Sequence, residues 1–390
     1  MASTLVHTDI SNTSQNIIKR IYFDNAATTP LDKEVLEAML PYMLEHFGNP
    51  SSIYSYGRET RMAIENARKS VSKTLGTTPG EIFFTSGGTE SNNTAIAASI
   101  RDLGCMHIIS SAIEHHAVLH TVEYYGHNKE VELSFVKLSE EGEVDYEDLE
   151  EKLKASKSKT LVSLMHANNE VGVLLDIKKV GELCKKFDAY FHSDCVQTIG
   201  HYPVDLSALH IHFISAAGHK FHGPKGTGIL YVNRQISIKP FIIGGGQERN
   251  MRAGTENVYG IVGFAKALEI AMRNFEKDST YIKDLKNYMH NQLVKNIEGV
   301  CFSCQGNTLY TVLSVCFPKN EKSDMLLFNL DINNICASGG SACSSGADAG
   351  SHVMKALNKT EKWITVRFSF SKYNTKEEVD IVIQKLKQFV

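Results

Sequence analysis

Short apolar runs alternate with helix-forming segments across most of this chain, and this alternation constrains the fold more than any other feature. Six runs of strand-like composition lie between Ile21 and Val258, at 81–84, 106–109, 161–165, 190–191, 211–214 and 228–232. Strands that alternate with helices build a mostly parallel sheet covered by helices. Ligands of such sheets bind beyond the carboxyl ends of the strands. We therefore expect an α/β fold with a functional site at that edge.

The pattern changes after Val258, where apolar residues recur at helical spacing as far as about Gly299. Strand-like runs follow at 310–317 and 363–369, and a helical pattern runs from Thr375 to the end. This part predicts a smaller α/β domain.

The expected domain organisation has three parts. Residues 1–20, rich in Ser, Thr and Asn, are expected to form a flexible N-terminal extension. A large domain at 21–258 would precede a small C-terminal domain at 259–390, with the N-terminal segment packing nearby.

Composition narrows the class of partner. The 390 residues are 42% hydrophobic and 22% charged, and their net charge of −3 does not indicate nucleic acid or an anionic membrane as a partner. No run approaches the ~18 to 20 apolar residues of a membrane span. The eight cysteines show no disulfide framework and follow no signal peptide. We expect a small-molecule substrate, reduced thiols and a cytoplasmic location.

Asp194 and Lys220 follow two of the expected strands, 26 positions apart. A lysine that forms a Schiff base and a carboxylate that keeps the pyridine nitrogen protonated are the two protein groups that pyridoxal phosphate most needs. Taken singly, most Asp and Lys residues are solvated surface groups. Their pairing at one sheet edge indicates a pyridoxal phosphate enzyme.

A Gly-Gly-Thr turn within Thr85–Ser91 is a candidate site for the cofactor's phosphate. It lies between a strand pattern and a helix pattern, where backbone N–H groups can bind an anion and Thr89 can cap the helix. An ordinary strand-to-helix turn has the same composition. The interpretation as a phosphate site is therefore supported only by the presence of Asp194 and Lys220 further along the chain.

Cys343 stands alone in a run of small residues at 337–350. A nucleophilic cysteine must be exposed, able to ionise and free to reach its target, and a mobile loop of this kind would allow that. A Gly/Ser linker that happens to contain a cysteine has the same composition. The residues alone leave both interpretations open.

Together these residues resemble a known family, the cysteine desulfurases of the NifS-like and IscS-like group within the class V aminotransferases. The resemblance runs from about Ile21 to the C-terminus, with many motifs in the family's order. They are Asp24–Pro30, Phe47–Ser51, Thr85–Ser91, Glu114–His115, Asn168–Gly172, Asp194 with Gln197, Gly218–Lys220, Met251–Thr255, Ser338–Ser344 and Val366–Ser369.

The resemblance implies a pyridoxal-phosphate-dependent transferase of fold type I, similar to aspartate aminotransferase, with a mostly parallel seven-stranded sheet in the large domain. It implies conversion of L-cysteine to L-alanine, with the sulfur left as a persulfide on Cys343. Acceptor proteins for iron–sulfur cluster assembly or tRNA thiolation would take that sulfur. The implied assembly is a homodimer with composite active sites.

The resemblance also assigns roles to single residues. Lys220 would bind the cofactor, Asp194 would contact the pyridine nitrogen and Gln197 the phenolate oxygen. His115 would stack on the ring, where an imidazole of near-neutral pKa can move protons. Lys220, His115 and Cys343 would be the catalytic residues.

Further residues would bind the phosphate and the substrate. The residues expected at the phosphate are Gly88, Thr89, His219 and, from a partner subunit, Thr255. Asn169 is expected beside the cofactor and, with Arg367 as a two-pronged donor, at the substrate carboxylate.

Some of these patterns fit other interpretations. Arg367 in an apolar strand could be a structural ion-pair residue. His116 and His120, four positions apart, could form a metal pair, but no further ligand cluster is evident and no metal site is expected. Cys301 and Cys304 have the spacing of a redox or zinc pair, yet ordinary strand-end cysteines explain them better.

Two positions depart from the family pattern. Ala217 stands where relatives usually place a serine, and the lost hydroxyl donor to the phosphate would cost about 1 kcal/mol if nothing compensates. The sequence ends at Val390, whereas housekeeping relatives carry a longer tail that docks an iron–sulfur scaffold, so scaffold docking is left open.

Other functions are compatible with this fold. A selenocysteine lyase would differ mainly in how the loop cysteine is used. A non-catalytic pyridoxal-phosphate-binding adaptor of a sulfur-transfer complex would need neither Lys220 nor Cys343. An ordinary aminotransferase would release pyruvate and would leave the cysteine without a role.

Overall fold

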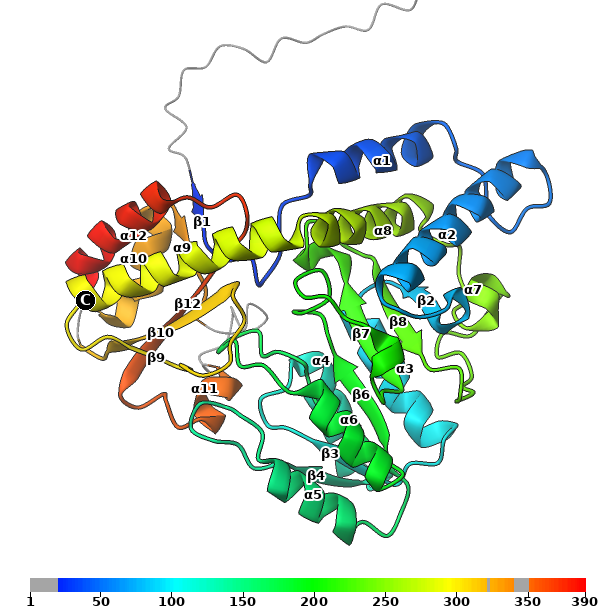
Figure 1. Cartoon of the computed structure of the whole chain (residues 1–390), viewed down its shortest axis with the longest axis horizontal. Helices are drawn as coiled ribbons and strands as arrows, with labels where there is room; N and C mark the ends of the chain where they lie inside the picture. The colour runs from blue at the N-terminus through cyan, green and yellow to red at the C-terminus, as the bar shows by residue number, and fades with distance from the viewer. Residues whose placement is uncertain (1–19, 321–322, 340–350) are drawn as a thin grey trace, which may run out of the picture.

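A seven-stranded sheet organises the larger lobe of the molecule (Figure 1). The computed structural model describes residues 20–320, 323–339 and 351–390. The strands of this sheet are β2 (Ile82–Thr85), β3 (His107–Ser110), β4 (Glu132–Phe135), β5 (Thr160–Ser163), β6 (Tyr190–Asp194), β7 (Phe213–Ala217) and β8 (Gly228–Val232).

The strand order across this sheet is β2-β8-β7-β6-β5-β3-β4. Neighbouring strands from β7 to β4 are parallel, whereas β8 runs antiparallel to both β2 and β7. The mostly parallel seven-stranded sheet predicted from the sequence is therefore confirmed.

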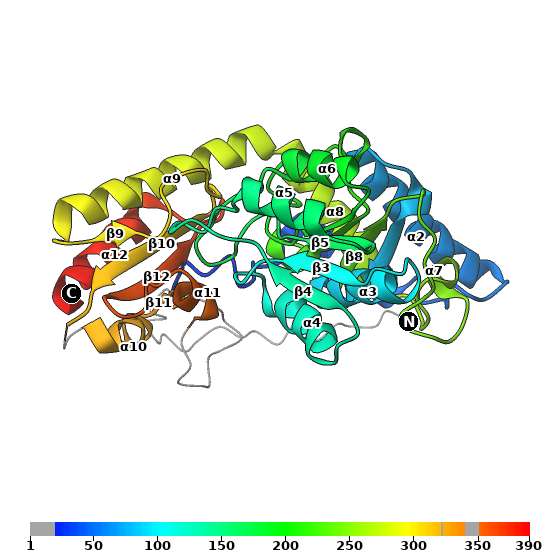
Figure 2. The ribbon, with the colours of Figure 1, turned by 90° about the horizontal axis from the view of Figure 1, so that it is seen from below.

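Helices cover both faces of the sheet (Figure 2). The helices on one face are α1 (Lys33–Leu44), α2 (Ser55–Thr74), α5 (Tyr146–Ala155), α6 (Ile177–Lys186) and α8 (Val258–Arg273). The helices on the other face are α3 (Gly88–Arg101) and α4 (His116–His127). This lobe, with the short helix α7 (Gln247–Asn250), is called the large lobe below.

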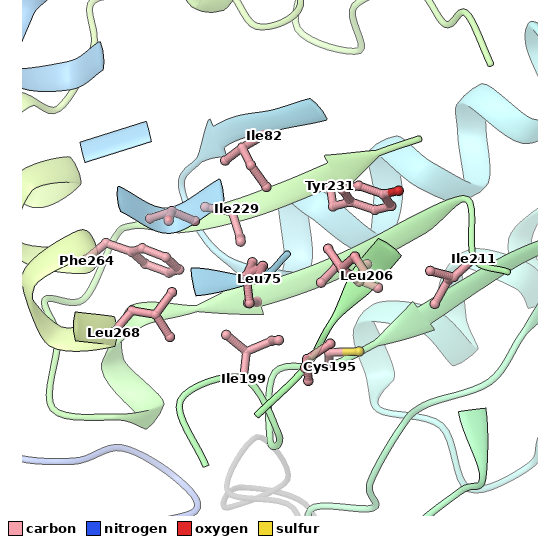
Figure 3. Close-up of a cluster of buried hydrophobic side chains, with 14 of the residues drawn as sticks. Leu75, Ile82, Cys195, Ile199, Leu206, Ile211, Ile229, Tyr231, Phe264 and Leu268 are labelled. Carbon is pink, nitrogen blue, oxygen red and sulfur yellow. The ribbon is translucent and has the colours of Figure 1, made fainter. Parts of the chain in front are cut away.

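The core of the large lobe is divided by the sheet, because consecutive strand residues point to opposite faces. Ile109 belongs to the apolar cluster that also contains buried side chains of α8, and its neighbour Ile108 to the cluster that contains buried side chains of α4. Figure 3 shows part of the first cluster, where Phe264 and Leu268 of α8 lie beside Ile229 of β8. Since both faces are buried, most strands read as continuous apolar runs.

The small lobe is built from the C-terminal part of the chain around a second core. Its strands are β9 (Cys301–Phe302), β10 (Val312–Pro318) and β12 (Trp363–Ser369), which form an antiparallel sheet, and β11 (Ile335–Cys336), which pairs with β1 (Ile21–Tyr22). Its helices are α9 (Phe275–Asn296), α10 (Leu326–Ile332) and α12 (Lys376–Phe389). Helix α11 (His352–Ala356) comes from the same part of the chain but packs in a separate cluster with residues of the large lobe.

The chain passes between the lobes at two places. Ile21 and Phe23 pack in the core of the small lobe, although they precede the large lobe in sequence. Helix α8 packs with the large lobe and α9 with the small one. The domain limits expected from the sequence stay a prediction. None of the helices among the described residues is long and apolar enough to cross a membrane.

A buried ion pair fixes the segment around α7 to the edge of the sheet. Arg68 of α2 donates to Glu248 through two parallel bonds of 2.8 Å, and both side chains are 2% exposed. Glu248 also accepts the backbone N–H of Phe84 at 2.9 Å. Its φ of 44° lies in the left-handed region, which non-glycine residues rarely adopt, so these bonds hold a strained backbone in place.

We expect Arg68→Met to lower the free energy of unfolding by about 3 to 5 kcal/mol, because Glu248 would be left as a buried charge without its partner. Urea unfolding of the variant measures this change. Lys186→Met is the matched control, since the Lys186–Glu150 pair is 60% and 41% exposed and such pairs contribute at most about 1 kcal/mol. Equal losses in the two variants would contradict the role assigned to the buried pair.

Candidate active site

A cavity of about 260 Å³ lies at the carboxyl ends of the parallel strands. The resemblance assigned catalytic, cofactor-binding or substrate-binding roles to eleven residues, and nine of them line this cavity. They are Gly88, Thr89, His115, Asn169, Asp194, Gln197, His219, Lys220 and Arg367. Of the other two, Thr255 lies elsewhere and Cys343 lies outside the described residues. Residues scattered over nearly 300 positions of sequence therefore meet at the edge where the fold class places ligands.

Lys220 ends a short turn that follows β7 and presents its amine to the cavity. Its Nζ donates to the carbonyls of Ala26 and Ala27, at 2.7 and 2.8 Å. The Nε2 of Gln197 donates to the same Ala26 carbonyl at 3.0 Å. The backbone at 26–27 therefore orients both side chains, a role that the sequence did not reveal.

Asp194 is the last residue of β6, and its carboxylate is held by two donors. Oδ2 accepts from Asn92 Nδ2 at 2.7 Å, and Oδ1 accepts from the N–H of Val196 at 3.0 Å. The side chain is buried, with 6% of the residue exposed. Both donors fix the direction of the carboxylate.

A chain of buried hydrogen bonds orients the Asn92 amide. His192 Nε2 lies 3.2 Å from Asn92 Oδ1, and Ser163 Oγ lies 2.8 Å from His192 Nδ1. Burial lowers the pKa of His192 to about 3, so the ring is neutral at physiological pH. Because Asn92 Oδ1 can only accept, His192 donates from Nε2 and accepts from Ser163 at Nδ1. Asn92 is thus constrained to turn its NH₂ toward Asp194.

His115 caps the N-terminus of α4 and lines the cavity. Its Nδ1 accepts the backbone N–H of Ala117 at 3.1 Å. Burial, with the nearby Lys220 charge, lowers the pKa of His115, and Asp194 opposes that shift. In the neutral ring the proton must then sit on Nε2, which makes this nitrogen the one that can exchange protons within the cavity.

The start of α3 forms one end of the cavity, with Gly88 and Thr89 in its wall. A Cβ at Gly88 would lie only 2.6 Å from Val196 Cγ2, so the close packing of this turn requires glycine. The first N–H groups of a helix favour an anion. His219 lies in the same wall, and burial together with the Lys220 charge lowers its pKa to about 4.

Ala217 also lines the cavity beside this turn, where a serine would have supplied a hydroxyl. The donor set as a whole fits pyridoxal phosphate. A helix N-terminus suits its phosphate, an amine its aldehyde and a fixed carboxylate its ring nitrogen.

Arg367 of β12 brings the small lobe into the cavity wall. Nη2 forms an ion pair with Asp24 at 2.6 Å, and Nη1 donates to the Asn169 carbonyl at 2.7 Å. The structural ion pair considered from the sequence is therefore present. The buried Nε has no hydrogen-bond partner among the described residues.

Thr255 is exposed and lines a separate hollow with Ser86 and Arg252, behind the turn that leads into α3. The structure does not bring it into the cavity of its own chain. A role in a partner's cavity stays a prediction.

The other polar clusters considered from the sequence adopt ordinary contacts. His116 Nδ1 and His120 Nε2 are 2.9 Å apart and share a hydrogen bond. Within the described part of the chain, no group of three or more His, Cys, Asp or Glu residues is placed to hold a metal ion. Cys301 and Cys304 are free thiols.

Asn92 and Asp24 were not assigned a role from the sequence, although both contact residues that were. Asn92 follows Thr89 by three positions on α3, a spacing that places two side chains on the same helix face. That spacing could have indicated from the sequence that Asn92 lies on the same side of α3 as Thr89. Asp24 lies in the Asp24–Pro30 motif, but its partner Arg367 is 343 positions away.

Comparisons with known proteins agree with this geometry. Cysteine desulfurase IscS of Dictyoglomus turgidum is 43% identical over 380 residues, which cover 95% of each chain. A solved structure described as a NifS-like protein is 37% identical with a TM-score of 0.87, covering 95% of this chain and 99% of that one. The structure of SspA in complex with cysteine is 32% identical with a TM-score of 0.79, covering 92% of this chain and all of that one.

Residues 21–382 match the family Aminotransferase class-V, which covers both lobes and every cavity residue described above. With this match and relatives of such identity over nearly the whole length, the chain belongs to the class V aminotransferase family.

Proposed function

We propose that this protein is a cysteine desulfurase that converts L-cysteine to L-alanine and carries the sulfur as a persulfide on Cys343. The observation that carries the proposal is the meeting of Lys220, Asp194 and His115 in one cavity. The 43% identical relative named a cysteine desulfurase and the similar structure with bound cysteine support it. The class V family uses pyridoxal phosphate, so the cofactor predicted from the sequence is confirmed.

When bound, pyridoxal phosphate supplies an electron sink that makes the proton on the substrate's Cα acidic. Asp194 and Gln197 would hold its ring, and His115 would lie against it. The residues that would hold its phosphate are Gly88, Thr89, His219 and, from a partner subunit, Thr255. Lys220, whose amine is aimed by two backbone carbonyls, would bind the aldehyde and then remove the Cα proton.

Arg367 and Asn169 would bind the substrate carboxylate and so orient Cα toward Lys220. The Arg367–Asp24 pair keeps the guanidinium in place before the substrate arrives. His115, with its exchangeable proton on Nε2, would carry protons between the substrate and the cavity.

Sulfur transfer would begin when the Cys343 thiolate attacks the substrate sulfur. An S–S bond forms, the Cβ–S bond breaks, and its electron pair remains with Cβ, which then gains a proton. L-cysteine and a protein thiol thus give L-alanine and a protein persulfide, without an outside oxidant or reductant. A thiol reductant, or an acceptor protein, then takes the terminal sulfur and restores Cys343.

We further propose that acceptor proteins for iron–sulfur cluster assembly or tRNA thiolation take this sulfur. Neither class of acceptor is favoured by the residues described above. The cytoplasmic location stays a prediction.

The function is tested by incubating the purified protein with pyridoxal phosphate, L-cysteine and a thiol reductant, and by measuring alanine and sulfide together. We expect the two products in equal amounts. Pyruvate in place of alanine would contradict the proposal and indicate an aminotransferase. L-selenocysteine is assayed in parallel, and turnover of that substrate alone would indicate a selenocysteine lyase.

A homodimer is the proposed assembly, and an exposed apolar surface at the end of the large lobe supports it. Large apolar side chains lie open between α1 and α2, with Leu44 72%, Phe47 74% and Ile53 90% exposed. Surfaces of this kind on a folded protein mark interaction sites. The exposed position of Thr255 suits a residue that enters the cavity of a partner subunit.

Ile53→Asp is expected to weaken this dimer at least about tenfold. A buried isoleucine contributes ~1.5 to 3 kcal/mol, and a symmetric interface contains it twice. Light scattering across a dilution series measures the dissociation constant. Ile332→Asp is the matched control, because Ile332 is a 60% exposed isoleucine at the end of α10 in the small lobe. A wild-type protein that is monomeric at every concentration would contradict the proposed assembly.

A further inference from the structure

Helix α11 belongs to the C-terminal part of the chain, yet it packs against segments of the large lobe. Its side chains share one buried apolar cluster with residues that follow β3 and β5. The cluster consists of Ile113, Val171, Val173, Val353, Met354 and Leu357. The segments that α11 contacts are therefore those that carry two cavity residues, His115 and Asn169.

A buried hydrogen bond fixes the start of α11 to the second of these segments. Ser351 Oγ donates to Glu170 Oε2, and the two residues are 8% and 1% exposed. The same hydroxyl accepts the N–H of Met354 at 3.1 Å, so it also caps α11. Burial raises the pKa of Glu170, and the bond from Ser351 opposes that shift.

His352 makes the contact with the first segment. Its Nε2 lies 2.9 Å from the carbonyl oxygen of Glu114, to which it donates. The ring also packs on that of His116, with 4.4 Å between the ring centroids. Glu114 and His116 flank His115, so the contacts of His352 lie on both sides of that cavity residue.

Ser338, which precedes Cys343 in the sequence, is also held by hydrogen bonds. Its backbone pairs with that of Arg367 in both directions, at 2.6 and 3.2 Å. Ser338 therefore lies beside Arg367, whereas Ser351 and His352 lie beside the neighbours of Asn169 and His115. Both attachment points adjoin residues of the cavity wall.

We propose that Glu170, Ser351 and His352 are positioning residues that fix one end of the Cys343 segment to the active site for sulfur transfer. The inference rests on the proposed function, since it takes Cys343 as the sulfur acceptor. Cys343 lies eight residues before Ser351, and a chain advances at most ~3.5 Å per residue. An anchored Ser351 thus limits the space that the thiol can search and raises its effective concentration at the substrate.

The test separates sulfur transfer from the earlier proton removal. Exchange of the Cα proton of L-alanine for deuterium needs Lys220 and the cofactor but no sulfur acceptor. In Glu170→Ala and Ser351→Ala, we expect alanine formation from L-cysteine to fall at least about tenfold, because small misplacements of a reacting group are costly. We expect Cα exchange to stay within about twofold of wild type. Ser351→Thr keeps the hydroxyl and should restore transfer.

Two further measurements exclude a merely structural effect. Asp176→Ala is the matched control for Ser351→Ala, because Asp176 caps α6 by accepting the N–H of Lys179 at 3.0 Å and lies outside the cavity wall. It should leave both reactions unchanged. Hydrogen exchange of the backbone amides of residues 351–357 should be faster in Glu170→Ala than in wild type, whether or not the cofactor is bound.

The outcomes distinguish this inference from the function on which it rests. An equal fall of alanine formation and Cα exchange, or no fall in either, would overturn the positioning role. Retention of wild-type alanine formation by Cys343→Ser would instead overturn the proposed function, and this inference with it.

Discussion

Cys343→Ser is expected to reduce alanine formation from L-cysteine at least about a thousandfold while the protein still binds pyridoxal phosphate. A thiolate is available near neutral pH and its sulfur can hold a second sulfur atom, whereas a serine hydroxyl neither ionises there nor forms a persulfide. The cavity residues proposed to hold the cofactor, among them Lys220 and Asp194, are unchanged in this variant. Amino acid analysis measures the alanine, and visible absorbance measures the bound cofactor.

Cys336→Ser is the matched control, because Cys336 is a half-buried free thiol of the small lobe outside the cavity wall. We expect this variant to keep wild-type turnover. Mass spectrometry of the wild-type protein after one turnover should find the added sulfur on the peptide that contains Cys343. A persulfide on another cysteine, or undiminished turnover in Cys343→Ser, would disprove the assigned role.

The fold was predictable where strands are buried on both faces. The run at 228–232 became a strand with those bounds, β8, in which all five residues are buried. Strand β4 at Glu132–Phe135 gave no comparable signal, because it lies at the sheet edge with Glu132 exposed and the other three side chains half-buried. A strand with so little burial leaves no continuous apolar run in the sequence.

The cavity was predictable where chemistry demands particular side chains, as for Lys220 and Asp194. The groups that orient these two side chains could not be predicted from the sequence. Ala26 and Ala27 act through carbonyl oxygens, which every residue type carries, and Asn92 acts on Asp194 across 102 positions of sequence. Contacts of this kind depend on which strands become neighbours, and that information appears only in the folded chain.

Lys220→Ala is expected to reduce Cα proton exchange of L-alanine at least about a thousandfold. Its amine is held in the cavity wall at 2.7 and 2.8 Å from two carbonyl oxygens, and removing a positioned base costs 10²- to 10⁴-fold or so before the loss of cofactor attachment is added. Nuclear magnetic resonance in deuterated water follows the exchange. Treatment of the wild-type holoenzyme with sodium borohydride should also fix the cofactor permanently on the peptide that contains Lys220.

Lys225→Ala removes a second lysine, five positions further along, whose side chain is exposed and which does not line the cavity. This variant should exchange the Cα proton at the wild-type rate and should still be labelled on Lys220. Because exchange precedes sulfur transfer, Lys220→Ala must lose both reactions, whereas Cys343→Ser must lose only the second. Cα exchange that survives in Lys220→Ala would mean that another base of the cavity wall, such as His115, removes the proton.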